Sequence, residues 1–125
     1  MKAAADGLPE VGPTARTLGV RAGDKAPHND VTATAPTDSV VPNTGGMSVA
    51  PDDPTNLPKN RRPAALGGTG NDPVWEIDDS DLGEELKFRQ DKKTHGFVEV
   101  AQEMTLYEYE QVLTATRTKW RRVVG

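Results

Sequence analysis

The sequence predicts an α+β domain, and two observations carry this prediction. Segments 73–77, 86–89 and 97–100 alternate apolar with polar residues, which is typical of short strands with one buried face. A pattern of helical spacing then runs from residue 105 to residue 120. Strands followed by one closing helix indicate the α+β class.

Composition limits the size of the core. Of 125 residues, 34% are apolar, and the chain contains 12 glycines and 10 prolines. A chain this polar and this rich in turn-forming residues builds one small core that does not use every residue. Residues 1–14 are small, polar and interrupted by prolines, so we expect a mobile tail there and a single domain over residues 15–125.

Charge and residue types disfavour several function classes. A formal net charge of −4 argues against a general nucleic-acid coat protein, which needs a basic surface. The absence of cysteine excludes disulfides, thiolate metal sites and thiol nucleophiles, and we expect no metal site. No membrane span or secretory leader is recognisable, so we expect a cytoplasmic location, with or without delivery by a secretion system that needs no signal.

The first half of the chain offers only short strands. Residues 15–21 alternate enough for a weak first strand, on which either Arg16 or Arg21 points inward. The segment 22–42 has the composition of a loop unless another part of the chain docks it, and Val40-Val41 before Pro42 is a candidate for a brief strand. The glycine pair 45–46 then introduces a strand at 47–49.

A long irregular segment, 52–73, leads to the next strand. It carries several prolines and the glycine-rich run 67–70, and a loop of this length in a compact domain is more often functional than structureless. A phosphate-binding loop would need Gly-Lys-Ser/Thr feeding a helix, whereas residues 71–73 feed a strand. The glycine run therefore does not predict a phosphate loop.

The closing helix has the clearest signals. Thr105 and Glu108 fit a capping box, in which each side chain bonds the other residue's amide. One buried stripe is predicted to contain Leu106, Tyr109, Leu113, Thr116 and Trp120. Arginine and lysine residues surround Trp120, and we interpret them as favourable charge at a helix C-terminus, with nucleic-acid contact as the less favoured alternative.

Two residues on or beside the strand at 97–100 are candidates for chemistry. Glu99 lies between two valines and faces away from them, so it is either an exposed carboxylate or part of a cleft wall. In a cleft, it would bond a ribose hydroxyl and stabilise an oxocarbenium-like cation. His95, just before Gly96, is either a turn residue or a residue that contacts the same cleft.

The order of segments along the chain resembles a known family. The succession resembles type VI secretion effector toxins that act in the bacterial cytoplasm and have an ADP-ribosyltransferase-like fold. The resemblance covers roughly residues 16–120 and rests on Thr44-Gly45-Gly46-Met47-Ser48-Val49, the proline-broken loop, Leu86-Lys87-Phe88-Arg89-Gln90-Asp91, Thr94-His95, Met104 and Trp120.

This resemblance implies a small split β-sandwich with a long irregular loop and a C-terminal helix, and a cleft that binds NAD as substrate. It implies that Arg21, or Arg16, holds the dinucleotide, that Ser48 braces the cleft and that Glu99 stabilises the ribosyl cation. His95 is a further candidate binding residue, and Trp75 or Tyr107 would form an aromatic wall. Nicotinamide would leave as a macromolecular acceptor or water attacks the anomeric carbon.

The chain departs from the general transferase pattern at two places. Only Ser48 remains of a Ser-Thr-Ser pattern, and Phe97 stands where a second Glu or Gln would favour an arginine acceptor. The resemblance also implies a neutralising immunity protein in the producer cell. The alternative function is a non-enzymatic binding module that blocks a cellular partner through its 52–73 loop.

Overall fold

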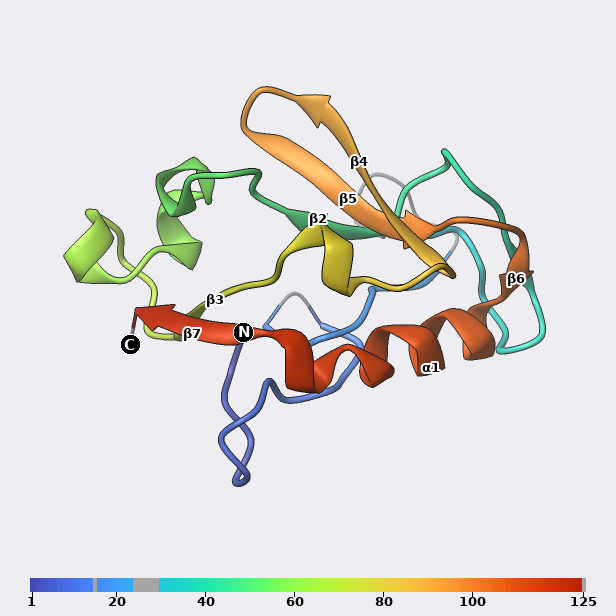
Figure 1. Ribbon diagram of the computed structural model, residues 1–125, viewed down its shortest axis with the longest axis horizontal. Coiled ribbons are helices and arrows are strands. Elements are labelled where there is room, and N and C mark those ends of the chain that lie inside the picture. Colours follow the sequence, from blue (N-terminus) through green and yellow to red (C-terminus); the bar gives the residue numbers. More distant parts are fainter. Residues whose placement is uncertain (15, 24–29, 125) are drawn as a thin grey trace.

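The computed structural model describes residues 1–14, 16–23 and 30–124, and within them it contains short strands and one α-helix (Figure 1). The strands are β1 (Ser39–Val40), β2 (Met47–Val49), β3 (Val74–Glu76), β4 (Leu86–Lys92), β5 (His95–Val100), β6 (Met104–Thr105) and β7 (Arg121–Val124). The helix is α1 (Leu106–Ala115). Short 3-10 turns lie at Pro54–Asn56, Lys59–Arg61, Ala64–Leu66, Asp79–Asp81 and Arg117–Lys119.

The strands form small antiparallel sheets. The largest has the order β2-β5-β4, while β3 pairs with β7 and β1 pairs with β6. In Figure 1 the β4–β5 hairpin lies above the molecule's centre, α1 lies below it, and the β3–β7 pair lies to the left. Separate small sheets and one helix near the C-terminus confirm the predicted α+β class and agree with a split sandwich.

The register of β5 gives the central sheet two chemically different faces. Val98 lies opposite Met47 on β2 and opposite Phe88 on β4, so these three apolar side chains share one face. Glu99 lies opposite Lys87 and belongs to the other face. A slip of one residue would exchange the two faces.

The predicted capping box opens α1. The Thr105 hydroxyl accepts a hydrogen bond from the Glu108 amide at 3.1 Å, and the Glu108 carboxylate accepts one from the Thr105 amide at 3.3 Å. The predicted stripe is buried throughout: Leu106, Tyr109, Leu113, Thr116 and Trp120. The helix therefore closes the core with the face that its periodicity predicts.

Replacing Thr105 with alanine removes the hydroxyl that accepts from Glu108. We expect the free energy of unfolding to fall by about 1 kcal/mol, as measured by urea denaturation. Thr105→Ser keeps the hydroxyl and is expected to retain most of the stability. Equal denaturation midpoints for Thr105→Ala and the wild type would contradict a stabilising role for the cap.

The helix ends earlier than the sequence predicts. Its last residue is Ala115, and a 3-10 turn and β7 follow, although the stripe predicted helix as far as residue 120. The Thr116 hydroxyl donates to the Leu113 carbonyl at 2.6 Å and accepts from the Trp120 indole at 2.9 Å. These bonds hold the Trp120 side chain in the core although the helix has already ended. The residues that follow form β7 and pair with β3.

The Tyr109 hydroxyl connects α1 to the central sheet. It accepts a hydrogen bond from the Met47 amide at 3.1 Å and donates one to the Val98 carbonyl. Burial raises the pKa of Tyr109, so the hydroxyl remains a donor. A Cβ atom at Gly46 would lie 2.6 Å from this hydroxyl oxygen, so the hydroxyl can approach the backbone here only because residue 46 has no side chain.

The N-terminal segment differs from what the sequence predicts. Residues 16–21 form no strand; isolated bridges pair Val11 with Leu18 and Ala22 with Val31, and residue 15 lies outside the described residues. The expected tail 1–14 contacts the domain, since the Arg117 guanidinium donates to the Pro9 carbonyl at 3.0 Å and Pro9 is buried. Residues 1–14 thus lie against the rest of the chain, unlike a free tail.

The long segment 52–73 is irregular, as predicted, but it is internally bonded. The glycine-rich run is bonded back to the turn at 59–61, since the Thr69 amide donates to the Lys59 carbonyl at 3.0 Å and the Gly70 amide donates to the Arg62 carbonyl at 2.8 Å. In Figure 1 this green segment forms the left end of the molecule. No helix in the described part of the chain is long and apolar enough to span a membrane.

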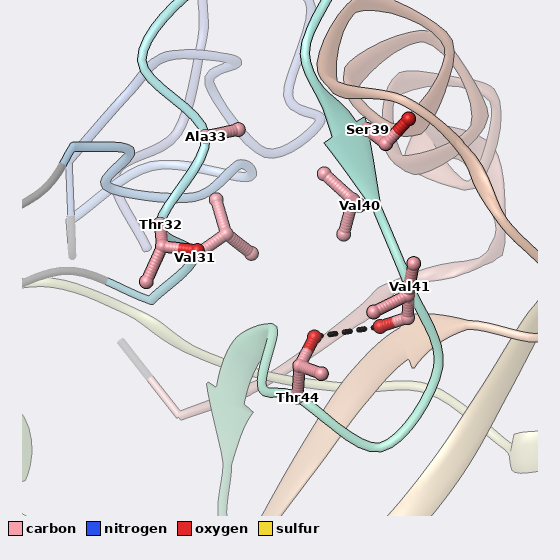
Figure 2. Close-up of a pocket in the computed structure, with 7 residues that line it drawn as sticks. All are labelled: Val31, Thr32, Ala33, Ser39, Val40, Val41 and Thr44. Atoms are coloured by element: carbon pink, nitrogen blue, oxygen red, sulfur yellow. Dashed lines mark hydrogen bonds between the residues drawn. The ribbon is translucent and has the colours of Figure 1, made fainter.

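A small cavity lies at the opposite end of the fold. Figure 2 shows Val31, Thr32 and Ala33 facing the segment around β1, with the Thr44 hydroxyl bonded to the Val41 carbonyl at 2.6 Å. Its volume is about 80 Å³, far below the roughly 300–1,000 Å³ of small-molecule sites. This cavity is too small for a nucleotide.

Candidate active site

A large cleft separates the central sheet from the β3–β7 pair. Its volume is about 1230 Å³, and β2, β4 and β5 line one wall while β3 and β7 line the other. Ala50, Pro51 and most of residues 52–58 from the start of the long segment also line it. In Figure 1 the central sheet lies in the upper part of the molecule, the β3–β7 pair lies below it and the green segment lies on the left.

The apolar face of the central sheet forms the inner wall of this cleft. Met47, Phe88 and Val98 line it from β2, β4 and β5. Buried Val74 and Trp120 line it from the opposite side. An apolar wall with polar groups at its edge is typical of a ligand-binding site.

Of the two arginines that the sequence proposed for NAD, only Arg21 lines the cleft. Its amide donates to the Asp30 carboxylate at 2.8 Å, and its guanidinium lies 3.9 Å from the same group. Burial raises the pKa of Asp30, while the Arg21 amide counteracts that effect. Arg16 is not among the lining residues, and its guanidinium binds Asp72 through two bonds of 2.7 and 2.8 Å.

Ser48 and Trp75 line the cleft from different sheets. Ser48 is exposed on the edge strand β2, and because it lies opposite Phe97 its side chain is on the face of the sheet that carries Glu99. The Trp75 indole donates to the Met1 carbonyl at 2.6 Å, and the Arg122 guanidinium lies 5.1 Å from the Trp75 ring centroid. Tyr107, the other aromatic candidate, is 57% exposed and does not line the cleft.

His95 lines the same cleft from the start of β5. Its Nδ1 lies 2.7 Å from the Asp91 carboxylate, and this hydrogen bond lowers the pKa of Asp91. The His95 ring also meets Phe97 edge to face, with 4.8 Å between centroids. The histidine is therefore held by the β4–β5 hairpin and is not a free turn residue.

The structure does not bring Glu99 to the cleft. Its side chain is fully buried, and its two oxygens accept from the Arg89 guanidinium at 2.7 and 3.4 Å. The Lys87 ammonium lies 3.8 Å away. The sequence left open an exposed carboxylate or a cleft carboxylate, and the observed geometry is neither.

Asn43 and Gly46 help to explain this burial, because they lie close to Lys87 and Glu99 on the face of the sheet that carries Glu99. The Lys87 ammonium donates to Asn43 at 2.8 Å, and a Cβ at Gly46 would lie 3.0 Å from the Glu99 Cβ. The bond to Glu99 raises the pKa of Arg89. Glu99 thus belongs to an ion pair behind the cleft wall.

Sequence reasoning missed the contribution of the long segment to the cleft. Asn60 and Arg61 line it beside the prolines of 51–58. Arg61, a cation in a long loop, was the feature of the sequence that could have indicated a binding residue. No sequence pattern indicated that it lies beside β3 and β7. Carboxylates also line the cleft and outnumber its guanidinium groups.

Comparison with known proteins identifies the family. A family model described as Tse2 ADP-ribosyltransferase toxin matches residues 1–122. Searches of the curated proteins and of the solved structures gave no match. The matched region includes both cleft walls, the long segment and the N-terminal segment. The chain therefore belongs to the Tse2 ADP-ribosyltransferase toxin family.

Proposed function

We propose that this toxin uses NAD as its substrate and either transfers ADP-ribose to an acceptor or hydrolyses NAD. The observation that carries the proposal is the cleft of about 1230 Å³ between two small sheets, lined by Arg21, Ser48, Trp75 and His95. Membership of an ADP-ribosyltransferase toxin family supports the same substrate.

In this proposal the four residues bind and orient the dinucleotide. Arg21 donates hydrogen bonds to it, Ser48 donates from the rim of the cleft at the edge strand β2, and Trp75 presents an aromatic surface to one of its rings. His95 contributes a polar group whose orientation Asp91 fixes. The apolar inner wall of the cleft excludes water from the rings of the bound dinucleotide.

The reaction breaks the bond between the ribose C1′ and the nicotinamide nitrogen. Its electron pair leaves with nicotinamide, which becomes neutral, while an acceptor atom or water bonds to C1′ and releases its proton to solvent. Positive charge develops on the ribose, and the carboxylates lining the cleft stabilise it electrostatically. Glu99 supports the wall from behind as a scaffold residue, because its oxygens already accept from Arg89.

Release of nicotinamide tests the proposed function. Purified protein is incubated with NAD labelled in the nicotinamide ring, with and without bacterial lysate, and the free label is quantified. We expect turnover by the wild type and a loss of about tenfold to a hundredfold in Arg21→Ala. Ser48→Ala is expected to lose activity in the same assay.

Two further variants sharpen this test. Arg16→Ala is expected to have a smaller effect than Arg21→Ala, because Arg16 binds Asp72 and does not line the cleft. Lys93→Ala, at an exposed position away from the cleft, controls for removal of a positive charge. Equal activity of Arg21→Ala and Lys93→Ala would contradict the role given to Arg21.

The site of action and the partner belong to the same proposal. The toxin acts in the bacterial cytoplasm, where NAD is available, and its producer carries a neutralising immunity protein. Growth arrest on cytoplasmic expression, together with loss of cellular NAD or labelling of an acceptor, is the expected outcome. Growth arrest without NAD turnover would instead favour the non-enzymatic binding module.

A further inference from the structure

The geometry points to Arg61 as the residue that binds the diphosphate of the dinucleotide, an inference that rests on the proposed use of NAD. Arg61 ends the 3-10 turn Lys59–Arg61 in the long segment and lines the cleft. Neither the family match nor the sequence patterns assigned it a role. The ligand class is a nucleoside diphosphate, either free or as part of a dinucleotide.

Three arginines line the cleft, and two of them have carboxylate partners within it. The Arg21 guanidinium lies 3.9 Å from Asp30, and the Arg121 guanidinium lies 3.1 Å from Glu76. Charge on these two groups is therefore partly neutralised before a ligand arrives.

Arg61 differs from the other two. Among the described residues its side chain has no hydrogen bond and no ion pair, although it is half-buried. Partial removal of a guanidinium from water without an anionic partner is unfavourable. An anion that enters the cleft would supply that partner, and a diphosphate matches the planar fork of donors on arginine.

Two of the acids that line this part of the cleft are engaged with other groups. The Asp72 carboxylate binds Arg16 at 2.7 Å, and the Asp53 carboxylate accepts from the Thr55 amide at 2.9 Å. These carboxylates would repel an anionic ligand, so binding of a diphosphate requires an uncompensated cation in the cleft. Arg61 is that cation among the described lining arginines.

The glycine-rich run 67–70 supports the turn that carries Arg61. A Cβ at Gly68 would lie 2.0 Å from the Arg62 carbonyl oxygen, and one at Gly70 would lie 2.7 Å from the Asn60 carbonyl oxygen. The Arg62 guanidinium itself donates to the Leu66 carbonyl at 3.0 Å, within the segment. The glycines thus allow close backbone packing that fixes residues 60–62, and Arg61 remains available to a ligand.

Equilibrium binding of ADP and of NAD tests this assignment. In titration calorimetry at low salt we expect Arg61→Ala to weaken binding of both nucleotides by about tenfold to a hundredfold. Nicotinamide riboside, which lacks the diphosphate, is expected to bind Arg61→Ala as it binds the wild type. Lys59→Ala removes the same charge from the same turn at an exposed position outside the cleft, and it is expected to bind both nucleotides like the wild type.

The outcomes separate this inference from the proposed function. Equal ADP affinity of Arg61→Ala and wild type overturns the role of Arg61, while NAD consumption by the wild type would still support the proposed reaction. Arg61-dependent binding of ADP without NAD consumption supports a diphosphate site and counts against the reaction. Absence of binding of both nucleotides by a folded wild type overturns both.

Discussion

The Glu99→Gln variant is expected to lose about 3 kcal/mol of the free energy of unfolding. Glutamine has nearly the shape of glutamate but no charge, so the Arg89 guanidinium loses the carboxylate that it contacts at 2.7 Å. The Lys87 ammonium, 3.8 Å from the same oxygen, becomes a second uncompensated cation beside a buried group. Thermal and urea denaturation measure the loss.

A double-mutant cycle with Arg89 isolates the ion pair. The cycle compares Arg89→Met, Glu99→Leu and the double variant, which lacks both charges, and we expect the double variant to be more stable than Glu99→Leu alone. The Glu99→Gln variant separately distinguishes a scaffold role from a catalytic role. A Glu99→Gln protein with wild-type stability and no NAD turnover would show that Glu99 acts in the reaction and that its assignment to the scaffold is wrong.

Tyr109→Phe is expected to lose about 2–4 kcal/mol. The variant keeps the ring in the core but leaves the Met47 amide and the Val98 carbonyl without the hydroxyl that bonds both. Denaturant midpoints of the variant and the wild type measure the loss. Tyr107→Phe is the matched control, because Tyr107 is exposed and its hydroxyl makes no hydrogen bond with the described residues.

The stability difference between the wild type and Tyr109→Phe is expected to depend on pH in a defined direction. Burial raises the pKa of Tyr109 in the folded state above its ordinary value of 10.0. Stabilisation by the protonated hydroxyl is therefore fully present below pH 10 and is lost as the pH rises toward the folded-state pKa. The stability difference between wild type and Tyr109→Phe should narrow above pH 10, and a constant difference would contradict this account.

Local periodicity predicted most regular elements. The alternation at 86–89 and 97–100 predicted β4 and β5, and the capping box with its apolar stripe predicted α1. Such signals depend on residues two to four positions apart, which the sequence displays directly. Burial of Trp120 followed from the same stripe.

Other elements depend on contacts between distant residues. The residues of β7 were assigned to the basic helix end, yet they form a strand because β3 lies beside them, with Glu76 paired to Arg121. The first strand was expected at 15–21, but its described residues 16–21 form no continuous strand pairing, and the bridges near them are isolated ones at Leu18 and Ala22. The pairing of β7 with β3, which is distant in the chain, leaves no periodic mark in the β7 segment.

By itself the sequence determined the α+β class, the apolar face of α1 and the fact that Glu99 and Val98 point to opposite sides of β5. Alternation along a strand determines on which side of the sheet each side chain lies, but it does not determine which residues cover that side. Only the tertiary structure decided that the Val98 side, with Met47 and Phe88, faces the cleft and that Arg89 and Lys87 contact Glu99 on the other side. The physical reason is that a buried carboxylate needs a cation, and Arg89 supplies it from the neighbouring strand.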